Sequence, residues 1–103
     1  MMDWINAFPM SELDAGEWRV LELGDNDVAV FNIDGEYFAI EDTCTHDGGC
    51  LTGGRVEANI IECPRHGAQF DIKTGEALSP PAYEDLQTFA VRLNNDMVQI
   101  EYD

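Results

Sequence analysis

Two short motifs in the middle of the chain carry residue types that bind metals. Cys44-Thr45-His46 and Cys63-Pro64-Arg65-His66 each pair one cysteine with one histidine, and sixteen residues separate His46 from Cys63. The motifs contain both histidines of the chain and two of its three cysteines. Thiolates and imidazoles are both good ligands for transition metals. Because the intervening segment is long enough to hold a strand, the motifs predict one metal centre built from two loops.

Two kinds of metal centre use two cysteines and two histidines. Structural zinc takes this donor set, and so do two-iron clusters of the Rieske kind, in which histidines replace the cysteines on one iron. Zinc motifs usually pair cysteine with cysteine and histidine with histidine, whereas each half of this pattern is mixed. The mixed spacing favours the two-iron cluster, and structural zinc remains the alternative. Each residue taken singly would more often be an ordinary buried or surface side chain.

At these residues the chain resembles the Rieske [2Fe-2S] proteins. Their signature, Cys-x-His followed by Cys-x-x-His, is matched by Cys44, His46, Cys63 and His66. The resemblance extends to Gly67-Ala68-Gln69-Phe70-Asp71, to Thr74-Gly75, and to Pro80-Pro81-Ala82, which is similar to the proline loop of the family. By this resemblance the four motif residues hold one [2Fe-2S] cluster per chain. The cysteines would bind the inner, buried iron and the histidines the outer one.

The chain departs from the high-potential members of that family around the motifs. Those members have an extra cysteine in each loop, and the two cysteines form a disulfide. Here Cys50 stands one residue later in the first loop than the extra cysteine of those members, and Arg65 occupies the position of the extra cysteine in the second loop. We therefore expect Cys50 to be a free thiol, packed in its loop rather than redox-active. Arg65 has two interpretations, as part of a docking face or as a solvated charge.

The resemblance also implies a low reduction potential. High-potential members carry a serine and a tyrosine whose hydroxyls donate hydrogen bonds to the cluster and to a ligand thiolate. This chain has Ala68 and Phe70 there, and Glu41, Asp42 and Asp47 are near the motifs in the sequence. Fewer donors and more negative charge disfavour the reduced cluster. The expected potential is near the low end of the Rieske range, at about −150 mV.

The composition describes one acidic globular domain. The chain has 103 residues and 45% hydrophobic content, enough for a single core. We expect a single Rieske domain over 1–103, with a cluster-binding subdomain at about 42–82. The 21 acidic and 5 basic residues give a formal charge of −16, which would repel nucleic acid and favour a basic partner. The alternative explanation of this charge is solubility, or adaptation to a salt-rich cytoplasm.

Cysteine usage and hydropathy favour a cytoplasmic location. Three cysteines do not form the paired framework of a secreted domain. The first residues, Met1 to Ile5, lack the basic and apolar segments of a signal peptide. No apolar run approaches the length of about eighteen residues that a membrane span needs. We expect no membrane partner.

Short apolar segments separated by turn residues predict an all-β chain. The expected strands are 4–8, 18–23, 28–33, 37–40, 56–62 and 68–72, with a closing hairpin over 88–102 that has one buried face. Asp34-Gly35 and Asn94-Asn95-Asp96 are turn sequences, and Ser11 to Leu13 is compatible with one helical turn. The predicted fold is an antiparallel, Rieske-type barrel-like sandwich with a cluster-binding subdomain of two loops, each at a hairpin tip.

By its resemblance the chain is an electron carrier rather than an enzyme. It is similar to the ferredoxin component of ring-hydroxylating dioxygenase systems, which passes electrons from an NAD(P)H-dependent flavoprotein reductase to a terminal oxygenase. It would be a monomer that docks transiently at the face of its histidine ligands. The alternative is a small Rieske-fold subunit of a larger oxidoreductase, such as assimilatory nitrite reductase. With both histidines assigned to the cluster, none remains for a mononuclear iron site or a catalytic histidine pair.

Overall fold

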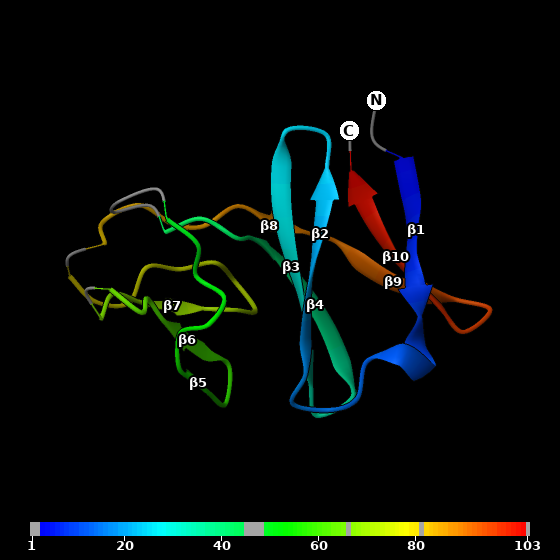
Figure 1. Cartoon of the computed structure of the whole chain (residues 1–103), viewed down its shortest axis with the longest axis horizontal. Coiled ribbons are helices and arrows are strands. Elements are labelled where there is room, and N and C mark those ends of the chain that lie inside the picture. The colour runs from blue at the N-terminus through cyan, green and yellow to red at the C-terminus, as the bar shows by residue number, and fades with distance from the viewer. Residues whose placement is uncertain (1–2, 45–48, 66, 81, 103) are drawn as a thin grey trace.

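Three antiparallel sheets make up the fold in the computed structural model, which describes residues 3–44, 49–65, 67–80 and 82–102 (Figure 1). The first sheet has the order β1 (Asp3–Pro9), β10 (Met97–Tyr102), β9 (Val91–Asn94). The second has the order β2 (Trp18–Leu23), β3 (Asn26–Ile33), β4 (Glu36–Glu41), β8 (Thr88–Phe89). The third has the order β5 (Val56–Glu57), β6 (Ile60–Glu62), β7 (Gln69–Asp71). The all-β, antiparallel class expected from the sequence is confirmed.

The second sheet is the middle layer, between the first sheet and the third (Figure 1). Its strand β3 contains the apolar run Val28-Ala29-Val30-Phe31, and all four side chains are buried. Successive side chains of a strand point to opposite faces, so a run of this kind needs cover on both sides. Val28 and Val30 pack toward the first sheet, whereas Ala29 and Phe31 pack toward the third.

Two apolar cores follow from this layering. The core against the first sheet contains Phe8, Leu13, Val28, Val30, Ala39, Phe89, Val98 and Ile100. The core against the third sheet contains Ala29, Phe31, Ile40, Cys44, Leu51, Ile61, Cys63, Ala68, Phe70, Ile72, Ala82 and Leu86. The second core includes both cysteines of the two motifs, so the middle sheet supports the candidate metal centre directly.

Local turn chemistry explains most of the strand boundaries. Asp34 and Gly35 have φ values of 53° and 90°, and Asn95 and Asp96 have values of 52° and 63°. Positive φ at both central residues is the geometry of the two-residue turn that suits the twist of a hairpin. A 3-10 helix covers Met10–Glu12, close to the helical turn expected there. In the described part of the chain, no helix is long and apolar enough to cross a membrane.

The segment expected to be one strand at 56–62 is a hairpin instead. β5 pairs antiparallel with β6, and Ala58 between them has a φ of 54°. Asn59 fixes this turn against the third strand of the sheet: its Nδ2 donates to Oδ1 of Asp71 at 3.0 Å, and its carbonyl oxygen accepts from the Ile72 N–H at 2.7 Å. The expected single strand was wrong because these long-range contacts of Asn59 decide the turn.

The closing segment also differs from the simple hairpin with one buried face. The chain changes sheets after Phe89, since β8 pairs with β4 while β9 pairs with β10. Leu93, on the edge strand β9, is 47% exposed. Gln99 is buried because its Oε1 accepts from Nε of Arg92 and its Nε2 donates to Oδ1 of Asn6, both at 2.7 Å. A buried polar side chain with hydrogen-bond partners therefore lies at a position where the alternation of apolar and polar residues predicts an exposed side chain.

The end of the first motif's loop lies alongside the end of β6, beside Cys63. The Glu62 N–H donates to the Arg55 carbonyl at 2.8 Å, and the Gly54 N–H donates to the Leu51 carbonyl at 3.0 Å. A Cβ atom on Gly54 would overlap the Glu62 carbonyl oxygen. Only glycine therefore lets this backbone lie against the strand that leads to the second cysteine.

We predict that Gly54→Ala lowers the free energy of unfolding by about 2 kcal/mol or more, because the added methyl meets backbone that has no room to move. Gly16→Ala is the control: its Cβ would meet nothing within 4 Å, and the φ of +87° alone should cost about 1 kcal/mol. Urea denaturation monitored by circular dichroism measures both. Equal midpoints for the two variants would contradict the steric argument.

Candidate metal centre

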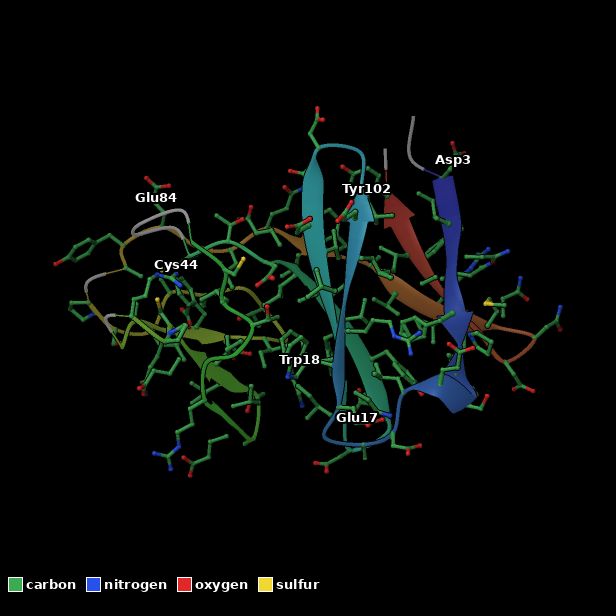
Figure 2. All side chains as sticks on the ribbon, in the orientation of Figure 1. Asp3, Glu17, Trp18, Cys44, Glu84 and Tyr102 are labelled. Carbon is green, nitrogen blue, oxygen red and sulfur yellow. The ribbon has the colours of Figure 1, made fainter. Side chains whose placement is uncertain are left out.

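Both cysteines of the sequence motifs are described, and the structure brings them into the same core. Cys44 follows β4 and Cys63 follows β6, and their side chains are 0% and 1% exposed. Figure 2 shows Cys44 at the end of the molecule that carries the third sheet, away from Tyr102 on the first sheet. His46 and His66 lie outside the described residues. Two of the four expected ligands are thus placed.

The two loops enter the centre in different ways. The second loop is the tip of the β6–β7 hairpin, as expected. The first loop connects β4 of the middle sheet to β5 of the third sheet, and these two strands are not partners in any sheet. The expectation of two hairpin tips is therefore wrong for the first loop, which is held between two sheets.

Each loop is closed by the same kind of backbone hydrogen bond. The Cys44 N–H donates to the Gly49 carbonyl at 2.7 Å, and the Cys63 N–H donates to the Ala68 carbonyl at 2.7 Å. In both loops the acceptor lies five residues after the cysteine. Each sequence motif falls inside the ring that its cysteine closes. The second ring is tightened by Gly67, whose φ is +75° and whose N–H donates to the Cys63 carbonyl at 3.1 Å.

A buried carboxylate clamps the first loop. Asp42 is 4% exposed, and its Oδ1 accepts from the N–H groups of Leu51 and Thr52 at 2.8 and 2.9 Å. Its Oδ2 accepts from Oγ1 of Thr52 at 2.8 Å. The Asp42 N–H donates to the Asp27 carbonyl at 2.8 Å, which ties the clamp to the middle sheet. Sequence reasoning treated Asp42 only as a nearby charge, because no motif or periodicity marks contacts across ten residues.

The segment after β7 covers the second loop. The Leu78 N–H donates to the Gln69 carbonyl at 2.8 Å, and Oγ of Ser79 accepts from the Gln69 N–H at 3.1 Å. Ala82 is 5% exposed and packs in the core that contains both cysteines. This is the segment expected to act as a proline loop; Pro81 lies outside the described residues.

Cys50 and Arg65 lie at the outer side of the two loops. Cys50 takes part in no disulfide, as expected, but it is exposed, so the expectation of a packed thiol was wrong. Nη1 of Arg65 donates to the Cys50 backbone carbonyl at 2.9 Å. Arg65 is also exposed, yet it is more than a solvated charge, because it contacts the other loop.

The described donors suit a metal centre in their chemistry. A thiolate in an apolar core is costly unless a cation compensates its charge, and a coordinated thiol is deprotonated. Ala68 and Phe70, both 0% exposed, lie in the same core and bring no hydroxyl to it. Within 3–44, 49–65, 67–80 and 82–102, no group of three or more histidine, cysteine or acidic side chains could hold a metal ion.

Comparison with known proteins agrees with this geometry. The family described as the Rieske [2Fe-2S] domain matches residues 3–90. The ferredoxin component of biphenyl 2,3-dioxygenase from Rhodococcus jostii (strain RHA1) is 38% identical over 92 residues, which cover 89% of this chain and 86% of that protein. The ferredoxin component of the naphthalene 1,2-dioxygenase/salicylate 5-hydroxylase systems from Ralstonia sp is 30% identical over 101 residues, covering 98% and 97%.

Solved structures share the fold over almost the whole chain. The Sphingomonas yanoikuyae B1 ferredoxin superposes with a TM-score of 0.89 at 32% identity, covering 98% of this chain and 100% of that one. A chain from the complex of reduced oxygenase and oxidized ferredoxin in carbazole 1,9a-dioxygenase gives a TM-score of 0.87 at 32% identity, covering 94% and 91%. Motif, fold and relatives therefore agree that this chain belongs to the Rieske [2Fe-2S] domain family and is similar to the ferredoxin components of dioxygenase systems.

Proposed function

We propose that the chain is an electron carrier that holds one [2Fe-2S] cluster through Cys44, His46, Cys63 and His66. The observation that carries this proposal is the burial of both cysteines in one core, each at the start of a loop closed by the same hydrogen bond. We further propose that residues 1–103 form a single domain, with the cluster-binding subdomain at about 42–82. All three strands of the third sheet fall within 42–82. The residues of the core that contains both cysteines also fall within this range, except Leu86 and the residues of the middle sheet.

A Rieske cluster supplies reversible one-electron transfer. The residues around it set how easily the electron is accepted. Two thiolates and two neutral imidazoles bring two negative charges, half the charge of four cysteines, which favours reduction relative to an all-cysteine site. Ala68 and Phe70 exclude water from the cysteine side and donate no side-chain hydrogen bond. Their apolar character works in the opposite direction, toward a lower potential.

The proposed partners are an NAD(P)H-dependent flavoprotein reductase as donor and a terminal ring-hydroxylating oxygenase as acceptor. The names of the relatives support a dioxygenase system, and a related solved structure is a complex of oxygenase and ferredoxin. We propose that the chain acts as a monomer in the cytoplasm and docks transiently at the face of its histidine ligands. The exposed thiol of Cys50, which forms no disulfide, suits a reducing compartment.

Surface charge supports a basic docking partner. The formal charge is −16, and several of the five basic side chains are engaged within the chain. Three lie over aromatic rings: Arg19 over Phe8 at 4.7 Å, Lys73 over Phe38 at 5.5 Å, and Arg92 over Trp4 at 4.2 Å. With 21 acidic and 5 basic residues, carboxylates dominate the charge that a partner meets. Such a field speeds the encounter with a basic surface more than it adds affinity, as a transient carrier requires.

Reconstituted turnover tests the proposed function. With NADH, a flavoprotein reductase and a terminal oxygenase of a biphenyl or naphthalene dioxygenase system, we expect product formation to depend on this protein. We expect the rate to fall several-fold between about 50 and 500 mM salt, because salt screens charge steering. Salt-independent turnover would contradict the docking argument. Stable co-purification with a large oxidoreductase subunit would contradict the role as a free carrier.

A redox titration tests the electrostatic argument. We predict a potential near −150 mV, because Ala68 and Phe70 lack hydroxyl donors. Electron paramagnetic resonance (EPR) or circular dichroism monitors the titration. The double variant Ala68→Ser/Phe70→Tyr should shift the potential upward by adding donors on the cysteine side. A wild-type value above about +100 mV would show that these residues do not set the potential.

The carboxylate clamp gives a stability prediction. Asp42→Ala should cost about 1–3 kcal/mol, because it leaves the N–H groups of Leu51 and Thr52 buried or half-buried without their acceptor. Asp42→Asn is the matched control, since its amide oxygen still accepts from both groups. Denaturation midpoints and iron content per chain measure the effect. If the two variants are equally stable, the clamp does not act through these hydrogen bonds.

A further inference from the structure

One side chain connects the outer parts of the two loops that carry the proposed ligands. Arg65, in the second loop, donates from Nη1 to the Cys50 carbonyl of the first loop at 2.9 Å. We propose that Arg65 is a positioning residue that fixes the spacing of the two loops and so the geometry of the ligand set. This inference rests on the proposed function, because it concerns the residues that would hold the cluster.

The fit between Arg65 and Gly49 supports this role independently. A Cβ atom on Gly49 would lie 2.5 Å from Cζ of Arg65, 2.6 Å from Nη2 and 2.9 Å from Nε. The guanidinium therefore occupies the space that any larger residue at Gly49 would fill. The Gly49 carbonyl is also the acceptor that closes the first loop at Cys44. Arg65, two residues after Cys63 in the second loop, thus contacts Gly49, the residue that closes the first loop.

The contact complements attachments at the base of the loops. There, the Glu62 N–H donates to the Arg55 carbonyl, and Gly54 lies against the same strand end. The cysteine side chains are held in the apolar core. Arg65 adds a link on the solvent side, because it is next to His66 in the sequence and contacts Gly49 and Cys50 of the other loop. Contacts at the base hold the inner parts of the loops, and the Arg65 contact restrains their outer parts relative to each other.

The chemistry of the guanidinium suits this task better than a simple charge. It is planar, carries five donors in a fixed arrangement, and stays protonated. It can therefore fill the space beside Gly49 and donate to the Cys50 carbonyl at the same time. A lysine would keep the positive charge, but its ammonium is a point on a flexible stem and cannot fill the same space.

Four variants separate position from charge. Arg65→Ala removes both, and Arg65→Lys keeps the charge without the planar group. Gly49→Ala keeps Arg65 but displaces its guanidinium. That methyl would meet the far end of a flexible side chain rather than backbone, and Gly49 is not among the glycines with positive φ, so the fold should tolerate it. Arg55→Ala is the control, because it removes an exposed cation of the same subdomain that pairs with Glu57.

The measurements are the rate of iron release to a chelator and the EPR spectrum of the reduced protein, both on anaerobically purified holoprotein. We expect Arg65→Ala, Arg65→Lys and Gly49→Ala to release iron about fivefold faster than wild type, the size expected for one lost hydrogen bond. Their EPR lines should be broader, because looser loops sample more ligand geometries. Arg55→Ala should match wild type. Gly49→Ala combined with Arg65→Ala should be no worse than Arg65→Ala alone, because both act through one contact.

The outcomes separate this inference from the function on which it rests. If wild type contains the cluster but Arg65→Lys and Gly49→Ala match it in iron release and EPR, the positioning role of Arg65 is overturned and the carrier remains. Additive effects in the double variant would also overturn it. If wild-type protein contains no iron and sulfide, the proposed function itself fails before any variant is compared.

Discussion

The burial of two thiols in one apolar core is the constraint on which the rest of the structure depends. Cys44 and Cys63 are as inaccessible as the isoleucines and phenylalanines around them. A deprotonated thiol in such surroundings needs a compensating cation, so this core is suited to ligand thiolates on a metal. The layering of the fold accommodates this core: β3 is buried on both faces, and Ala29 and Phe31 on one face pack into it. The first sheet then covers the other face.

The two loops that carry the motifs are each held by specific contacts within the fold. Each loop begins at a buried cysteine and is closed by a 2.7 Å hydrogen bond five residues later. Asp42 fastens the far end of the first loop to the middle sheet, and Gly54 lets that loop lie against the strand before the second cysteine. These contacts are made by backbone groups and by the buried carboxylate of Asp42. In metal sites, contacts around the ligands fix how the ligands are oriented.

The sequence predicted what depends on local chemistry. Cysteine and histidine spacing identified the family, and turn residues such as Asp34 and Asn95 placed the hairpins. The sequence did not predict features that depend on distant partners. Asn59 makes a turn inside an apparent strand because it bonds to the end of β7, and Asp42 is a clamp because of residues nine and ten positions later. Cys50 looked like a packed thiol, but its loop presents it to solvent beside the Arg65 contact.

The most direct test of the central claim is a metal and sulfide analysis of anaerobically purified protein, with an EPR spectrum after reduction by dithionite. The account predicts two irons and two acid-labile sulfides per chain, and a rhombic signal with the low average g value of a histidine-ligated cluster. One zinc per chain, with no sulfide and no signal, would contradict it. That result would mean that the buried cysteines of this Rieske-family chain serve a structural metal site and not electron transfer.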